Sequence, residues 1–527
     1  MSPPARLLLI LLSLLGSTAL QAQVHRTWNL EFPTSASGPA QEHFLDGVTY
    51  MHLHMFEDAE TAFRAAQTLA PAFVMAYWGE ALSQHRTIWS IHRYAEAQAV
   101  LARLGATPAA RAALAATPRE QQYLGAVELL FGTGTQEERE MAYSDAMRAL
   151  SEAYPADVEA TAWYGLSLMR ITPLGLTREQ TRSLLAATAL RVLSRNPRHP
   201  GANRYLIQAT DDPENSGLGI VAVENLSGID TDAAEALHIP SHYWLQHGMW
   251  QEVAASNWRA FNASMAWVKD HGWSLPDLNQ HNYGHLLQFA NYGYLQSGNL
   301  AQAAAIRDRV RTDYIASGLA PEIAVPFADV NARYVLDLEQ WQQAGQLAEI
   351  AREYNSVDPG LWQAIGVAAV RSGNLPLANE AVAALNGMSS NPAAQGPVTG
   401  RAVEGMVQLA QGQQEIGLNL LRQASELNWE QPTTLLGVPP RPVKPPVEMY
   451  AEALLETGDA ATALAQFQLG LTRYHGRTNL LLGAARAAEQ LGNSELAQHY
   501  YQQLAQIWRE ADAEHPLAAE VRKYSTR

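Results

Sequence analysis

A 34-residue spacing of small and aromatic residues restricts the fold of this chain more than any other feature. Near the C-terminal end, Ala463 and Phe467 recur as Ala497 and Tyr501 at that separation. Small residues at fixed places let two helices touch closely, and a proline ends the second helix of a pair. Near the other end, one such unit fills six places at once, with Gly47, Tyr50, Ala59, Phe63, Ala66 and Pro71. The spacing therefore predicts antiparallel pairs of helices.

Glycines mark the turns between the expected helices. Each lies five residues before the first small position of the next helix, and glycine just past a helix supplies the left-handed backbone that reverses the chain. Such turns occur at Gly298, Gly373, Gly412, Gly458 and Gly492. Stacked helix pairs bury a continuous core. The pattern resembles the tetratricopeptide (TPR) repeat and predicts an all-α fold, an α-solenoid of antiparallel helix pairs (a TPR-like superhelix) with irregular repeats.

Four segments carry a wider resemblance. They are residues 76–81 (AYWGEA), 204–213 (RYLIQATDDP), 238–242 (HIPSH) and 442–454 (PVKPPVEMYAEAL). On these segments the chain is similar to an exported bacterial TPR-repeat protein family of largely uncharacterised function. The resemblance implies a helical solenoid and brings no settled activity. Relatives often place histidine where Gln208 stands, so a family site that uses this position would be altered here.

The N-terminus predicts export. Arg6 precedes an apolar run from residue 7 to residue 15, and small residues follow through Ala19 and Ala22. This order is typical of a secretory signal peptide, which we place at residues 1–22. The run is shorter than the ~20 residues that cross a bilayer. We therefore expect a mature protein that is periplasmic or secreted and has no transmembrane segment.

The rest of the chain divides into four predicted parts. Residues 23–290 form an N-terminal TPR-like helical region with a surface rich in histidine and aromatic residues, and residues 291–436 form the middle helical repeats. Five prolines between Gly437 and Pro446 predict an extended proline-rich strap at residues 437–446. Residues 447–527 form the C-terminal TPR repeats.

Composition argues against several kinds of function. The formal net charge of −16 opposes binding to nucleic acid, which needs basic side chains against its phosphates. The chain has no cysteine, which excludes disulfides, thiolate metal sites and cysteine nucleophiles. A bound metal would therefore need histidine, carboxylate or backbone oxygen as ligands.

Histidine spacing indicates a candidate metal site in the N-terminal half. His238 and His242 are four residues apart, and so are His281 and His285. In a helix this spacing places both imidazoles of a pair on one face, within reach of a single cation. Pro240 interrupts the first pair, because a helix is expected to begin near it. Two such pairs on neighbouring helices would make a four-histidine site.

A fifth histidine is expected to join these pairs. His52 and His54 lie two residues apart, so only one can face the same centre, and we favour His54 at the end of its helix. The five rings would bind Zn, Cu or Fe, with Asp211, Asp212 or Glu80 as an oxygen ligand. In the alternative interpretation the rings fill space between helices or line a groove as hydrogen-bond donors. The adjacent Asp211 and Asp212 have two further interpretations: they form a general acid and base pair, or they cap the helix that follows.

Aromatic side chains gather before residue 290 and indicate a binding groove. Rigid amphipathic rings on a concave surface suit a peptide or a small ligand. The predicted groove is lined by Trp78, Trp89, Trp244 and Tyr283. In the alternative interpretation the rings fill the wide spaces between irregular repeats, and Trp78 stands where a repeat needs core packing.

These observations leave three hypotheses for function. The first is a periplasmic or secreted TPR-repeat scaffold that binds a protein, a peptide or a small ligand. The second is a metal-dependent enzyme or metal-binding protein that uses the histidine-rich site in the N-terminal half. The third is a passive structural component of the envelope. The sequence names no catalytic residue, since it holds neither a phosphate-binding loop nor a nucleophile elbow.

Overall fold

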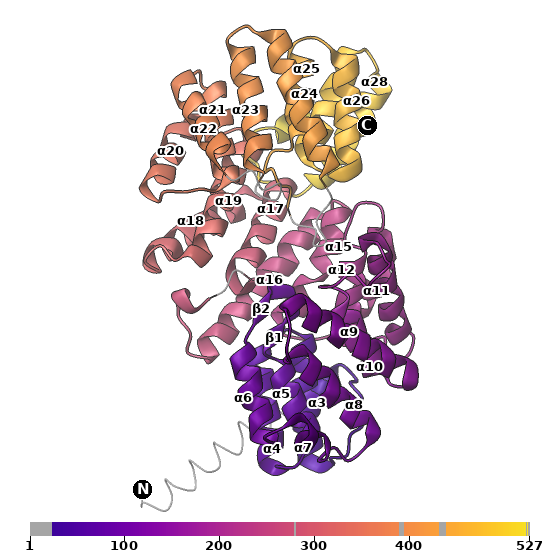
Figure 1. Ribbon diagram of the computed structural model, residues 1–527. Helices are drawn as coiled ribbons and strands as arrows, with labels where there is room; N and C mark the ends of the chain where they lie inside the picture. The colour runs from indigo at the N-terminus through magenta and orange to yellow at the C-terminus, as the bar shows by residue number, and fades with distance from the viewer. Residues whose placement is uncertain (1–23, 279–280, 389–394, 432–438, 523, 525–527) are drawn as a thin grey trace, which may run out of the picture. The chain divides into compact units, whose positions relative to one another are not determined.

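The computed structural model describes residues 24–278, 281–388, 395–431, 439–522 and 524. The chain divides into two compact units (Figure 1). The first unit comprises Met1–Thr210 and Gly217–Ile239, and the second comprises Asp211–Ser216 and Pro240–Arg527. The predicted boundary at residue 290 thus falls inside the second unit. The predicted signal peptide, residues 1–22, lies outside the described residues.

From residue 24 on, the regular structure of the first unit is helical apart from one short hairpin. Strands β1 (His85–Arg86) and β2 (Ile91–His92) pair antiparallel on either side of the 3-10 turn η1 (Thr87–Trp89). The helices are α2 (Val24–Thr27), α3 (Gly38–His52), α4 (Phe56–Leu69), α5 (Val74–Leu82), α6 (Tyr94–Leu104), α7 (Pro108–Ala112), α8 (Pro118–Leu130), α9 (Gln136–Ala153), α10 (Val158–Ser167), α11 (Arg178–Leu193), α12 (Pro200–Ala209), α13 (Ile220–Ser227) and α14 (Ala234–His238). The 3-10 turn η2 (Ser216–Gly219) precedes α13.

The described part of the second unit holds helices without strands. They are α15 (Pro240–Gln246), α16 (Trp250–Asp270), α17 (Leu286–Ser297), α18 (Leu300–Ala316), α19 (Pro321–Asp337), α20 (Ala344–Glu353), α21 (Pro359–Arg371), α22 (Leu375–Gly387), α23 (Gly396–Ala410), α24 (Gln414–Glu430), α25 (Pro446–Glu456), α26 (Ala460–Arg473), α27 (Thr478–Gln490), α28 (Ser494–Ile507) and α29 (Ala518–Arg522). Short turns are η3 (Leu275–Asp277), the π-turn η4 (His281–His285) and η5 (Trp341–Gln343).

Consecutive helices contact each other as antiparallel pairs, which confirms the predicted all-α fold of TPR type. Such pairs are α3 with α4, α8 with α9, α16 with α17, α23 with α24 and α27 with α28 (Figure 1). The described turn glycines adopt the positive φ that reverses the chain; at Gly298, for example, φ is 79°. No helix in the described ranges is both long and apolar enough to cross a membrane.

The repeat register is visible where glycine packs against phenylalanine. Gly79 follows Phe63, and Gly483 follows Phe467, by the same sixteen residues. A Cβ atom on either glycine would overlap the ring of its phenylalanine. The alanine four residues before each phenylalanine is fully buried. The two ends of the chain therefore use one packing unit, in which only glycine leaves room for the ring.

Replacing Gly483 by alanine should lower the free energy of unfolding of the second unit by about 1–3 kcal/mol, because Phe467 must shift to admit the methyl group. Gly345→Ala in α20 is the matched control. An added Cβ meets no atom there, and alanine favours a helix, so we expect unchanged or slightly higher stability. Urea denaturation of both variants makes the comparison. Equal midpoints would contradict the register.

The proline-rich segment before α25 lies against helices of the second unit. Its described residues, 439–445, form neither helix nor strand, and Pro446 begins α25. The backbone carbonyl of Lys444 accepts a hydrogen bond from Gln363 (2.7 Å), and the Lys444 amide donates to the same side chain (3.0 Å). Arg333 donates to the carbonyl of Pro440 at 2.9 Å. Residues 437–438 of the predicted strap lie outside the described residues.

Candidate functional site

The predicted metal-binding histidines do not share one helix pair. His238 ends α14 in the first unit, whereas His242 lies in α15 and His285 ends η4 in the second. Pro240 begins α15, so the first predicted pair is split between two helices. The side chain of His281 lies outside the described residues. His54 and His238 lie in the first unit, and His242 and His285 lie in the second, so the five-histidine centre remains a prediction.

His242 is held by a carboxylate in the second unit. Its Nδ1 lies 2.7 Å from Oδ2 of Asp211, whose other oxygen accepts a hydrogen bond from Gln246 (3.0 Å). The ring centres of His242 and His285 are 5.9 Å apart. A carboxylate on Nδ1 fixes the tautomer and leaves the lone pair on Nε2, which is how proteins orient a metal-binding imidazole. Asp211 therefore lies behind His242 and orients its ring.

Two of the other suggested oxygen ligands have structural partners. Asp212 accepts hydrogen bonds from the amides of Glu214 (2.9 Å) and Asn215 (2.8 Å), so it caps the turn that follows, as in the alternative interpretation. Glu80 in α5 is completely buried and accepts hydrogen bonds from Arg64, Gln67 and Arg103. These contacts compensate its charge and use both of its oxygens.

Two of the four aromatic residues assigned to a ligand groove belong to the core. Trp78 is completely buried in the first unit, and its ring centre lies 5.8 Å from that of Phe32 and 5.4 Å from that of Tyr123. Tyr283 is completely buried in the second unit and donates to Asp313 at 2.6 Å. Their large apolar surfaces fill the space between helices, which corrects the groove prediction. Trp89 and Trp244 are partly exposed and remain candidates.

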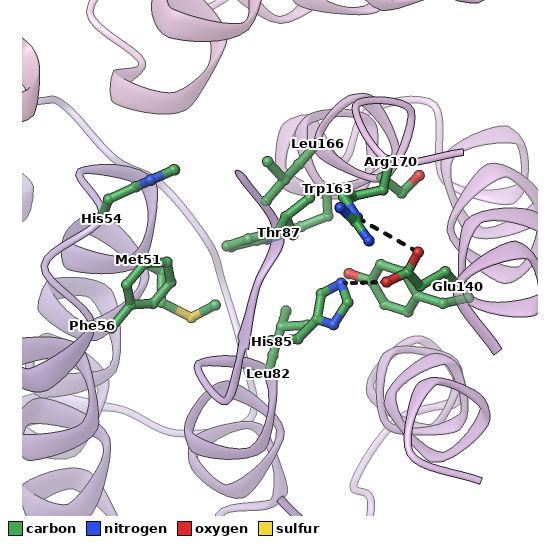
Figure 2. Close-up of a pocket in the computed structure, with 12 residues that line it drawn as sticks. Met51, His54, Phe56, Leu82, His85, Thr87, Glu140, Trp163, Leu166 and Arg170 are labelled. Atoms are coloured by element: carbon green, nitrogen blue, oxygen red, sulfur yellow. Dashed lines mark ion pairs between the residues drawn. The ribbon is translucent and has the colours of Figure 1, made fainter. Parts of the chain in front are cut away.

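The first unit contains a pocket where α3, α4, α5, α9 and α10 meet (Figure 2). His54 lies in the break between α3 and α4, in a left-handed conformation (φ 59°), and is one of the predicted residues that line it. The full lining is Met51, His54, Phe56, Leu82, His85, Thr87, Glu140, Tyr143, Trp163, Leu166, Ser167 and Arg170. The space open to the centre of a water molecule is about 20 Å³, so the pocket has room for one or two groups of that size.

Two buried donors in this lining have no hydrogen-bond partner among the described residues. They are the hydroxyl of Tyr143 and the indole N–H of Trp163, whose side chains are 5% and 1% exposed. Burial raises the pKa of Tyr143 above its ordinary value, so its hydroxyl keeps its proton. An unpaired buried donor costs about 1–3 kcal/mol. The pocket is therefore suited to a group that accepts hydrogen bonds.

One wall of the pocket carries a cluster that spacing did not reveal. His85 and His92 face each other across the hairpin, with their Nδ1 atoms 2.9 Å apart. Glu140 lies beyond them, its Oε1 3.9 Å from Nε2 of His85 and 3.7 Å from Nε2 of His92. Arg170 lies 3.7 Å from the other Glu140 oxygen, and Figure 2 shows Glu140 between His85 and Arg170. Burial, together with His92, Arg170 and Arg139, lowers the pKa of His85 to about 3.

A second buried histidine cluster in the first unit is fully bonded. Glu159 accepts from Nε2 of His52 (3.0 Å) and from Nε2 of His199 (2.9 Å). Nδ1 of His52 bonds to the hydroxyl of Tyr205, and Nδ1 of His199 accepts from the amide of Ala202. All four ring nitrogens are thus used. This cluster matches the alternative interpretation, in which histidines fill positions between helices.

The comparisons with known proteins find distant structural similarity. No known protein family matches the sequence, and neither does any curated protein. A human IFIT1 dimer with m7Gppp-AAAA is 14% identical, covering 93% of this chain and 94% of that one, with a TM-score of 0.33. A chain of the Cut9–Hcn1 APC/C hetero-tetramer is 13% identical (91% and 89% covered, TM-score 0.32). The TPR domain of P58(IPK) is 11% identical (87% and 99% covered, TM-score 0.23). TM-scores this low support no conclusion about this chain, so its fold is assigned from its own helix pairs.

Proposed function

We propose that this chain is an exported TPR-type binding protein, periplasmic or secreted, whose first unit takes a polar group of a peptide or small ligand. Export is supported by the signal-like order of residues 1–22. Binding is supported by one observation above all, the two unpartnered donors of Tyr143 and Trp163 in a pocket. Natural proteins leave very few buried donors unpaired, and each such group needs an explanation.

The size and polarity of the pocket restrict what it takes. Space for only one or two water-sized groups excludes complete burial of a drug-sized molecule, which needs roughly 300–1,000 Å³. The pocket therefore receives the tip of a ligand, such as a carbonyl or carboxyl group, while the remainder lies outside. Tyr143 and Trp163 donate to this tip, and the apolar side chains of Met51, Phe56 and Leu166 enclose it.

Tyr143→Phe tests this function, because it removes one hydroxyl and leaves the ring. Without ligand, the variant should be as stable as the parent or up to about 1 kcal/mol more stable, because no hydrogen bond is lost. Tyr123→Phe is the matched control. Its hydroxyl donates to Asp157 at 2.9 Å, so its removal should cost about 1–3 kcal/mol. Thermal denaturation of the ligand-free proteins gives both values.

Ligand binding is then measured with a panel of defined probes. We would titrate acetate, acetamide, and tripeptides with capped or carboxylate ends, and follow binding by calorimetry. At least one probe should bind the parent and the Tyr123→Phe control, and should bind Tyr143→Phe at least about tenfold more weakly, a loss of about 1.4 kcal/mol. If no probe binds the parent, or if Tyr143→Phe binds equally well, the proposal is wrong.

The second candidate function is the binding of Zn, Cu or Fe by His242 and His285 in the second unit. The observation in its favour is the 2.7 Å contact of Asp211 with His242, which orients the ring as in many metal sites. Elemental analysis of untagged protein, purified without chelator, tests it. The double variant His242→Ala and His285→Ala should lose one metal equivalent per chain, and an unchanged content would exclude these ligands.

A further inference from the structure

The hairpin of the first unit forces two imidazoles together. His85 and His92 are direct partners across the antiparallel strands β1 and β2, and their ring centres are 4.6 Å apart. Side chains in such a pair project to the same face of the ribbon. The tight turn ends at Ser90, whose φ of 55° is left-handed. The backbone, rather than a helix, therefore fixes the distance between the two rings.

The possible tautomers of this pair leave at least one ring nitrogen without a donor. A neutral imidazole carries one N–H, at Nδ1 or at Nε2. If both protons lie on Nε2, two Nδ1 lone pairs face each other at 2.9 Å. If one ring donates from Nδ1, its bare Nε2 faces Oε1 of Glu140 across 3.7–3.9 Å. Each neutral arrangement therefore leaves a ring nitrogen whose lone pair lies beside another acceptor, a position that a cation would fill.

Neighbouring donors do not remove this conflict. Gln136 donates to Oε1 of Glu140 at 2.9 Å. Among the described residues it makes no hydrogen bond to a nitrogen of His85 or His92. Arg170 donates to Ser90 at 2.8 Å and lies on the other oxygen of Glu140. Nε2 of His92 is buried and has no hydrogen-bond partner among the described residues. A cation beside Glu140 must compete with Arg170, whose side chain is 30% exposed and can move outward.

We propose that the first unit binds a divalent transition-metal ion such as Zn²⁺, with His85 and His92 as nitrogen ligands and Glu140 as the carboxylate partner. Two imidazoles and a carboxylate are a donor set that zinc accepts. Two ligand atoms on one tetrahedral zinc lie about 3.3 Å apart, given bonds of about 2.0–2.1 Å. Oε1 of Glu140 lies 3.9 Å from Nε2 of His85 and 3.7 Å from Nε2 of His92. One ligand atom from each of the three residues lies within 4.8 Å of the other two, so small side-chain rotations bring the ligands into place.

The remaining coordination position would face the pocket, because His85 and Glu140 line it. This inference goes beyond the proposed binding function. A cation can occupy the site whether or not a peptide or small ligand enters the pocket, and Tyr143 is not among the proposed ligands. Failure of one proposal therefore leaves the other standing.

The test uses the full mature chain without a histidine tag, stripped with EDTA and titrated with Zn²⁺ alone. His92→Gln is the main variant, because His92 is partly exposed and its loss should be tolerated by the fold. His499→Gln is the matched control, since His499 is exposed and its ring bonds only to Gln503 among the described residues. His242→Gln removes any equivalent that belongs to the second unit. Far-UV circular dichroism verifies that each variant is folded.

The parent should bind a zinc ion that His92→Gln binds at least about tenfold more weakly, with Glu140→Gln weaker by about 10–100-fold. His499→Gln and His242→Gln should keep this ion. The proposal is overturned if folded His92→Gln and Glu140→Gln both bind as the parent does. It is equally overturned if the parent binds no zinc beyond the equivalent that His242→Gln removes.

Discussion

Replacing Arg477 by methionine should lower the free energy of unfolding of the second unit by about 3–5 kcal/mol. The Arg477 guanidinium is completely buried and contacts Glu448 at 2.5 Å and Asp337 at 2.7 Å. Lys444 contacts the other oxygen of Glu448 at 2.7 Å. Removing one member of a buried ionic network leaves the opposite charges without compensation, which costs far more than the loss of a surface pair. Urea denaturation at neutral pH measures the change.

Acidic pH should weaken the same network. Burial raises the pKa of Glu448, but Arg477 and Lys444 lower it more, to about 2 from an ordinary 4.5. A depressed carboxyl pKa stabilises the folded state above pH 4.5, and this contribution is lost as the pH falls from 4.5 toward 2.

Arg509→Met is the control for Arg477→Met, because Arg509 is 56% exposed and should contribute less than about 1 kcal/mol to stability. If Arg477→Met and Arg509→Met lower the free energy of unfolding equally, Arg477 does not stabilise the second unit through its buried ion pairs.

Replacing Glu159 by glutamine should lower the free energy of unfolding of the first unit on the order of 3 kcal/mol at pH 7. Burial raises the pKa of Glu159, yet His199 and His52 lower it to about 2 from 4.5, and each unit of pKa corresponds to about 1.4 kcal/mol. Glutamine would also turn an NH₂ group toward one of two imidazole N–H donors. Denaturation midpoints between pH 7 and pH 3 measure both effects.

The pH dependence has a definite sign. The advantage of the parent over Glu159→Gln should be complete above pH 4.5 and should shrink as the pH falls toward 2, because the ionised carboxyl is then lost. Glu152→Gln in α9 is the control, since Glu152 is 65% exposed and its pair with Arg148 lies on the surface. A stability difference that does not change with pH would show that Glu159 is not ionised in the fold.

Local sequence patterns predicted the fold because repeat packing is itself local. Ala59, Phe63 and Gly79 lie within about two helix lengths, and the same spacing returns at Ala463 and Phe467. Small residues at these places have one physical reason, the close approach of two helices. The hairpin β1–β2 was not predicted, because strands of two residues show no alternation.

The pocket was not predictable in the same way. Glu140 meets His85 from a helix 55 residues later, and no local spacing encodes that contact. The four-residue spacing of His238 and His242 predicted that both lie on one helix face, but Pro240 begins a new helix between them. His54, which we predicted as a metal ligand, lines the pocket of the first unit, whereas His52 joins the buried cluster with Glu159. The choice between these histidines depends on where α3 ends, at His52.

A crystal structure of the purified protein, prepared without chelator and without a histidine tag, tests the proposed binding pocket most directly. We expect electron density for a polar group larger than water, within hydrogen-bond distance of both the Tyr143 hydroxyl and the Trp163 indole nitrogen. Ordered water alone on these two donors, unchanged after soaking with the probe that binds best in calorimetry, would contradict it.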